Sequence, residues 1–168
     1  MTVEVRIIGT DPPCPRCAIS GCIVAEVAAE SRVPISIEHM SYETEKAIRI
    51  GKDIGMIVGT AKHVASAANV TVDWMAVHRI IENPPSPQRL CRDPKGIASK
   101  WSPELDAMLR PCEEAASAAG ILMTPVLIIG GEIVHSGSVP TRGKVRDWLL
   151  RAEGNAAAKS GMQQKRCA

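Results

Sequence analysis

Two cysteines separated by two residues, Cys14 and Cys17, stand between a stretch typical of a β-strand and a stretch typical of an α-helix. Residues 3–8 alternate and then run apolar, with many β-branched side chains, which indicates a strand that enters a sheet. Gly9 and the prolines after it end this strand, and apolar residues then recur at near-helical spacing. Residues 35–40 alternate again. We therefore expect a strand–helix–strand unit with a right-handed parallel crossover.

A second β pattern lies toward the end of the chain. Residues 126–129 are typical of a buried strand, the pair Gly130–Gly131 indicates a tight turn, and residues 132–135 indicate a second strand. Together they predict a β-hairpin. We expect an amphipathic helix over residues 140–151 to pack on the sheet. Residues 152–168 are small, polar and basic, and we expect them to form a flexible tail.

The length of 168 residues fits one compact domain, which we expect over residues 1–151. Its core must be aliphatic, because the chain contains no Phe and one Tyr. Between the two β patterns, residues 71–82 and 102–120 are helical candidates, and we expect Pro111 to end or kink the second. The proline-rich segment 83–87 interrupts regular structure, because prolines lack the amide donor.

Composition and charge argue against two classes of partner. The formal net charge of +2 provides no basic face for nucleic acid, and one Tyr with three Trp leaves few aromatic side chains for base stacking. The longest nearly apolar run, residues 120–131, is shorter than the roughly 20 residues of a membrane-spanning helix. The first residues lack the pattern of a secretory signal. We expect a cytoplasmic protein with no nucleic-acid partner and no membrane partner.

The spacing of Cys14 and Cys17 predicts redox chemistry. At a helix N-terminus, positions three apart lie one turn from each other, so the two sulfurs can close a disulfide. The unpaired amides and the positive end of the helix dipole stabilise a thiolate there, and Arg16 adds positive charge. Cys14 is the predicted nucleophile and Cys17 the predicted resolving thiol. The alternative is half of a zinc site, but the strand before and the helix after favour a redox pair.

Thr124 and Pro125 come just before the first strand of the predicted hairpin. A central strand does not tolerate proline in its interior, so we expect Pro125 to begin the strand in a special conformation. A cis peptide bond is the expected form, because only X–Pro bonds reach cis at low cost. A simple turn boundary is the alternative.

In their order along the chain, these motifs resemble those of a thioredoxin-fold protein. The chain is most similar to the small glutaredoxin-like redox-active disulfide proteins, over residues 3–40 and 111–151. The motifs that carry the resemblance are Cys14-Pro15-Arg16-Cys17, Met123-Thr124-Pro125, the Gly130-Gly131 hairpin and Ser136-Gly137-Ser138-Val139-Pro140. The resemblance implies that Pro125 is cis and faces the disulfide, and that the backbone of Thr124 pairs with a substrate peptide.

An insertion of approximately residues 45–110 separates this chain from compact members of that family. It is similar to the helical insertion in the disulfide-oxidase and kappa glutathione-transferase branches of the fold. A helical cap over the Cys14 pocket would restrict access and select one partner, whereas an insertion on the opposite face would do neither. A glutathione transferase would not need the second thiol at Cys17.

The remaining cysteines are candidates for accessory thiols. Cys22 lies on the same predicted helix as Cys14, and we favour a buried packing residue over a third redox thiol. Cys91, between two arginines in the proline-rich loop, is predicted to be an exposed thiol that pairs with Cys112. Cys167 lies at the end of the predicted tail, and we expect it to have no role.

The sequence thus predicts an α/β thioredoxin-like fold with a mostly helical insertion, and a thiol–disulfide oxidoreductase. The expected partners are a protein or small-molecule disulfide and an upstream reductase or oxidant, with no cofactor or metal beyond the disulfide. Two alternatives stay open, a soft-metal or metalloid-binding module and a redox-sensing protein that binds a partner. The first alternative would use Cys14, Cys17 and Cys22 as ligands. The residues expected to bind or align the substrate are Pro15, Arg16, Thr124 and Pro125.

Overall fold

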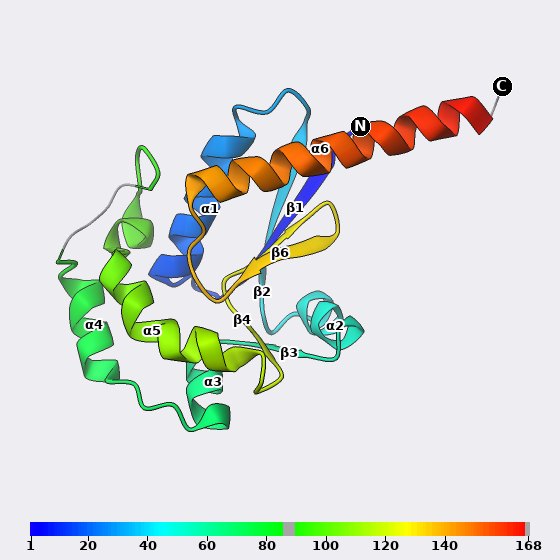
Figure 1. Ribbon diagram of the computed structural model, residues 1–168. Coiled ribbons are helices and arrows are strands. Elements are labelled where there is room, and N and C mark those ends of the chain that lie inside the picture. Colours follow the sequence, from blue (N-terminus) through cyan, green and yellow to red (C-terminus); the bar gives the residue numbers. More distant parts are fainter. Residues whose placement is uncertain (86–89, 167–168) are drawn as a thin grey trace.

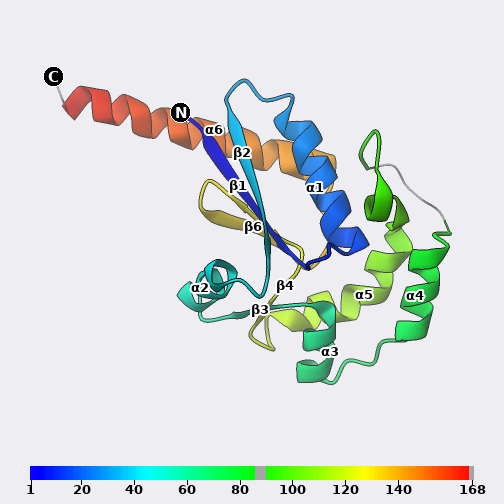
Figure 2. The same ribbon diagram turned by 180° about the vertical axis from the view of Figure 1, so that it is seen from behind.

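Four strands form a central mixed sheet (Figures 1 and 2). The computed structural model describes residues 1–85 and 90–166. In the sheet order β2-β1-β5-β6, β1 and β2 are parallel, while β5 runs antiparallel to both of its neighbours. The strands and the helix that connects the first two are β1 (Val3–Gly9), α1 (Pro15–Ala28), β2 (Ile35–Ser41), β5 (Val126–Ile129) and β6 (Glu132–Ser136). The predicted strand–helix–strand unit and hairpin are confirmed.

The two faces of the sheet carry separate apolar clusters, because successive strand side chains point to opposite faces. One face packs against α1 and α6 (Arg142–Arg166), and the apolar cluster on this side includes Val5, Ile23 and Leu149. The other face is covered by the insertion, through Ala47 of α2 (Glu45–Asp53) and Val58 of β3 (Ile57–Gly59). The insertion therefore contributes to the core and is not an appended layer.

The insertion contains most of the remaining helices, as predicted, and also a strand that the sequence pattern did not reveal. β3 pairs in parallel with β4 to form a second, two-stranded sheet. Pro111, which we expected to end or kink its helix, lies inside α5 and does not end it. Its ring is on the exposed side, while Leu109 and Cys112 hold the helix through its buried side. The elements not yet placed are α3 (Ala61–Ala68), α4 (Trp74–Glu82), η1 (Gly96–Lys100), α5 (Pro103–Ala116) and β4 (Ile121–Met123).

Helix α6 continues to Arg166, far beyond the predicted end at residue 151. Residues 152–166, which we expected to form a flexible tail, are helical. The run Ala156–Lys159 consists of strong helix formers with no proline, so nothing in the sequence ends the helix there. Figure 1 shows this part of α6 extending away from the rest of the molecule. None of the described helices combines the length and the apolar character needed to cross a bilayer.

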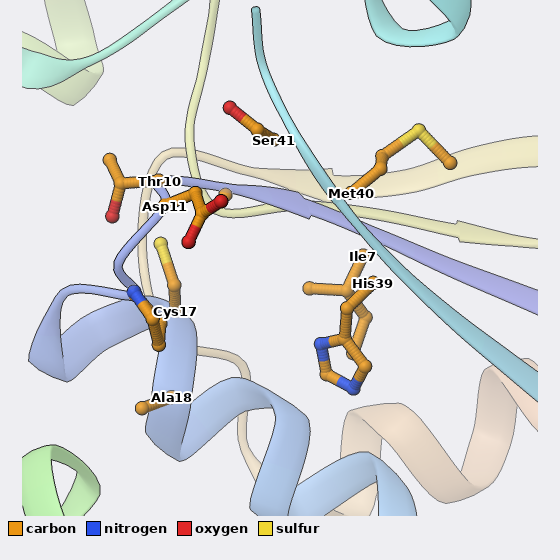
Figure 3. A pocket seen from close by; sticks show the side chains of 10 residues that line it. Ile7, Thr10, Asp11, Cys17, Ala18, His39, Met40 and Ser41 are labelled. Atoms are coloured by element: carbon orange, nitrogen blue, oxygen red, sulfur yellow. The ribbon is translucent and has the colours of Figure 1, made fainter. Parts of the chain in front are cut away.

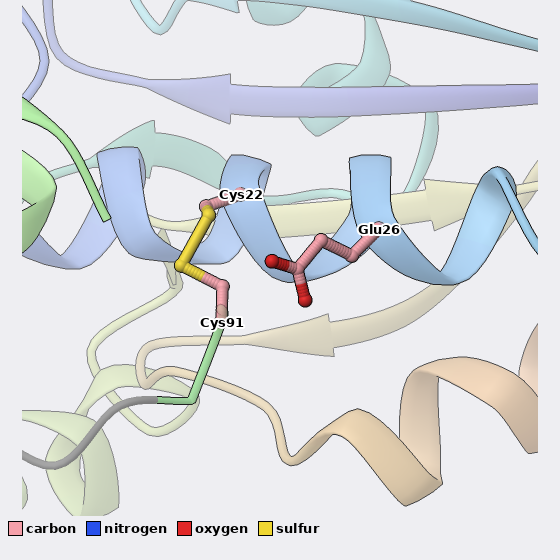
Figure 4. Close-up of side chains that lie close together, drawn as sticks. All are labelled: Cys22, Glu26 and Cys91. Atoms are coloured by element: carbon pink, nitrogen blue, oxygen red, sulfur yellow. A yellow bond between two sulfur atoms is a disulfide. The ribbon is translucent and has the colours of Figure 1, made fainter. Parts of the chain in front are cut away.

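A disulfide joins α1 to the insertion (Figure 4). Cys22 bonds to Cys91, with 6.1 Å between their Cα atoms and a sequence separation of 69. The expectation of an exposed Cys91 paired with Cys112 is therefore wrong, since Cys91 is buried and Cys112 is a free, buried thiol. The backbone N–H of Arg92 donates to Glu26, one turn beyond Cys22, and so holds this segment against α1. Cys167 lies outside the described residues.

Removal of this disulfide should lower the free energy of unfolding by about 2–4 kcal/mol, because a long loop regains freedom in the unfolded chain. Urea unfolding of Cys22→Ala/Cys91→Ala beside the wild type measures the loss. As a matched control, dithiothreitol should shift the urea midpoint of the wild type toward that of the variant. The midpoint of the variant should not change. Equal urea midpoints for the oxidised wild type and the variant would contradict this expectation.

Candidate functional site

Cys14 caps the N-terminus of α1. Its backbone is extended and its amide donates to Thr10 Oγ1 at 2.9 Å, while its sulfur accepts from the amide of Cys17 at 3.4 Å. Pro15 occupies the first turn, where a missing N–H leaves no helical hydrogen bond unmade. A thiol thus takes the place usually filled by a capping oxygen and faces the unpaired amides of the helix.

The two sulfurs of the motif lie next to each other. Cys14 Sγ and Cys17 Sγ are 3.1 Å apart and both thiols are free. Cys14 is half-buried, whereas Cys17 is only 4% exposed. Cys14 is therefore the more accessible of the two sulfurs, and Cys17 lies within reach of whatever is bound to Cys14.

This contact separates the acidities of the two thiols. The hydrogen bond from the Cys17 thiol, helped by the Cys17 amide and the Arg16 charge, lowers the pKa of Cys14 to about 6, although burial opposes the shift. The same hydrogen bond, together with burial and the charge of Cys14, raises the pKa of Cys17 well above its ordinary range. At neutral pH the pair therefore holds one thiolate and one thiol, with the negative charge on the more exposed sulfur.

Gly9, at the end of β1, makes room for the buried thiol. A Cβ atom at this position would lie 2.9 Å from Cys17 Sγ, closer than nonbonded atoms approach. The sequence suggested only that Gly9 ends the strand. Its position at the end of the strand, five residues before Cys14, is the signal that a side chain of the motif packs against it.

Arg16 is buried rather than open to a substrate. Its Nε donates to Asp106 Oδ1 at 2.7 Å, and its Nη2 donates to the carbonyl of Gly137. It is 4% exposed, and Pro15 beside it is also buried. The sequence placed Arg16 and Pro15 among the substrate-binding residues. The structure instead assigns the guanidinium to a contact with α5, because a buried charge needs a partner.

The Thr124–Pro125 peptide bond is cis. The register of Ile8 with Val126 places this bond beside the end of β1, at the edge of the sheet that carries the cysteine motif. Thr124 is buried and its N–H donates to the carbonyl of Gly59 at 2.8 Å. The insertion therefore already binds one of the two backbone groups of Thr124, the residue whose backbone the resemblance assigned to substrate pairing.

A pocket of about 360 Å³ opens beside Cys17 (Figure 3). Its wall combines apolar groups with the polar side chains of Asp11, His39 and Ser41. Sequence reasoning did not select these three residues. They follow or end the parallel strands β1 and β2, and the carboxyl ends of parallel strands are where clefts form.

The described residues bring together one group of three side chains with metal-ligand atoms, Cys22, Glu26 and Cys91. The sulfurs of this group are bonded to each other (Figure 4). The Glu26 carboxylate accepts hydrogen bonds from Arg142 and from the Arg92 amide. A disulfide leaves no thiolate to bind a cation. Cys14 and Cys17 are not part of this group, and Cys22 is bonded to Cys91, which does not favour a metal site of Cys14, Cys17 and Cys22.

A mixed sheet in the order β2-β1-β5-β6, with a cysteine pair at the start of the first helix and a proline before β5, defines a thioredoxin-like fold. The family model described as Thioredoxin domain matches residues 108–150, from within α5 to within α6. This match supports a thioredoxin-fold family. No curated protein and no solved structure matches the chain. The domain and the Cys22–Cys91 disulfide fit a redox role.

Proposed function

We propose that the protein is a thiol–disulfide oxidoreductase that uses the Cys14–Cys17 dithiol. One observation carries the proposal, namely two free sulfurs 3.1 Å apart at a helix N-terminus, of which the more exposed has the lowered pKa. Such an arrangement supplies a nucleophile at neutral pH and a second thiol placed to release it.

The reaction proceeds in two exchanges. The Cys14 thiolate attacks one sulfur of a substrate disulfide, so that a mixed disulfide forms, the substrate S–S bond breaks and one substrate thiolate leaves. Cys17 then loses its proton and attacks the Cys14 sulfur, which forms the Cys14–Cys17 disulfide and releases the second substrate thiolate. Two electrons pass to the substrate and two protons complete its thiols. The reverse sequence oxidises a dithiol substrate.

The substrate is a protein or small-molecule disulfide, or a dithiol in the reverse direction, and a second dithiol or disulfide protein restores the starting state. No further cofactor enters these steps. Thr124 and Pro125 lie at the same sheet edge as Cys14 and align the substrate chain. Because the Thr124 amide is bonded to Gly59, the groups left for this task are the Thr124 carbonyl and the Pro125 ring.

Equilibration in dithiothreitol redox buffers, followed by alkylation and mass spectrometry of the peptides, tests the proposal. We expect Cys14 and Cys17 to be oxidised together as one two-electron couple, separate from the Cys22–Cys91 couple. The proposal is contradicted if no disulfide between Cys14 and Cys17 forms at any redox potential. Protection of both thiols by bound metal, measured in a parallel metal assay, would favour the metal-binding alternative instead.

A further inference from the structure

One carboxylate of the insertion fixes two segments beside the cysteine motif. Asp106 Oδ1 accepts from Arg16 Nε at 2.7 Å, and its Oδ2 accepts from the amide of Val139 at 2.9 Å. The Asp106 side chain is 13% exposed and the Arg16 side chain 5% exposed. Arg16 also donates to the carbonyl of Gly137, two residues before Val139. Asp106, Arg16 and the loop before α6 thus form a closed hydrogen-bonded unit.

This unit reaches the reacting sulfur through Arg16. Arg16 belongs to the cysteine motif, and its positive charge helps to lower the pKa of Cys14. Asp106 places an opposite charge 2.7 Å from the same guanidinium. In a buried setting, an opposite charge at this distance cancels much of the field that the guanidinium exerts on other groups. The thiolate therefore experiences an arginine whose charge is partly neutralised.

A stabilising role alone does not explain the arrangement. Buried ion pairs contribute little net stability compared with apolar side chains of similar size, because both charges lose their hydration. Here one member of the pair, Arg16, is part of the cysteine motif, and the acid comes from a position 90 residues away in the sequence. The placement links the insertion to the chemistry of the site.

We propose that Asp106 is a positioning residue that sets the reduction potential of the Cys14–Cys17 couple by holding and partly neutralising Arg16. The inference rests on the proposed function. It assigns the insertion an electrostatic task, since α5 delivers the counter-charge that makes the dithiol less oxidising than a free arginine would.

The test measures the equilibrium of the Cys14–Cys17 couple with glutathione in the wild type and in four variants. Asp106→Asn removes the counter-charge while Gly137 still holds Arg16, so the thiolate and hence the reduced form are stabilised. We expect the couple to become more oxidising, with a shift of about threefold to tenfold in the equilibrium constant. Arg16→Gln should shift it in the opposite direction. The alkylation rate of Cys14 at acidic pH should rise in the first variant and fall in the second.

Two controls keep the outcome decisive. Glu114→Gln removes an exposed negative charge from the same helix and should leave the equilibrium unchanged. The double variant Arg16→Gln/Asp106→Asn contains no unpaired buried charge, so it folds even where Asp106→Asn alone does not. Its equilibrium constant with glutathione should lie close to that of the wild type. Two uncharged side chains replace an ion pair whose charges sum to zero, so the net charge beside the thiolate does not change.

The inference is overturned if Asp106→Asn has the same equilibrium constant with glutathione as the wild type. It is also overturned if the double variant is as reducing as Arg16→Gln. In both cases the proposed function stands. A wild type without a reversible Cys14–Cys17 couple overturns the proposed function itself. The two failures are therefore distinguishable in the same experiment.

Discussion

Cys14→Ser should lower the rate of thiol–disulfide exchange by about a thousandfold or more. The serine hydroxyl does not ionise near neutral pH, so the substitution removes the thiolate that attacks the substrate. Reduction of a glutathionylated peptide, followed by mass spectrometry, measures the loss. Cys112→Ala is the matched control, because Cys112 is also a free thiol but lies buried in α5. Its rate should stay near that of the wild type.

Cys17→Ser separates the two exchanges. The Cys14 thiolate still attacks, but no thiol follows to resolve the product, so a mixed disulfide between Cys14 and the substrate should accumulate. The mass expected for this mixed disulfide is that of the protein plus one of the two thiol components of the substrate disulfide. If Cys14→Ser and Cys17→Ser both turn over at the wild-type rate, neither cysteine carries the reaction.

The alkylation rate of Cys14 should rise with pH about a midpoint near 6 and level off above it, because only the thiolate reacts. A pKa of about 6 leaves about nine-tenths of Cys14 ionised at pH 7, against about one-hundredth for an ordinary thiol with a pKa of 9.0. Iodoacetamide rates between pH 4 and 10, read at the Cys14 peptide, give the profile.

The cause of the low pKa can be tested separately. The Cys17 thiol provides the largest stabilisation of the Cys14 thiolate, so Cys17→Ala should move the midpoint toward higher pH. A wild-type midpoint near 9 would show that Cys14 is an ordinary thiol. A Cys17→Ala midpoint equal to that of the wild type would assign the low pKa to the helix end and Arg16 instead.

Local patterns were sufficient to predict the central sheet and the cysteine motif. Alternation over residues 3–8 and 35–40, and the glycine pair at 130–131, each act over a few residues, and the observed strands lie where these patterns placed them. The spacing of Cys14 and Cys17 likewise fixes their contact within one helical turn. In these regions, short-range geometry determines the structure.

Contacts between distant segments could not be predicted in the same way. The Cys22–Cys91 bond spans 69 residues and the Arg16–Asp106 pair spans 90, and no periodicity connects such positions. Strand β3 has three residues, which is too short for an alternating pattern. The expectation that Arg16 binds the substrate followed from its place in the cysteine motif, and its buried partner Asp106 became visible only in the fold.

The hydrogen bond from Thr124 to Gly59 bears on any attempt to make a smaller form of this protein. Excision of residues 45–110 would remove the acceptor and leave a buried amide unpaired, at a cost of about 1–3 kcal/mol. It would also remove the counter-charge of Arg16 and the disulfide partner of Cys22. The shortened chain would keep Cys14 and Cys17 but would have a different surface around them. A minimal version of this site therefore has to be rebuilt around Thr124, because trimming the chain does not produce it.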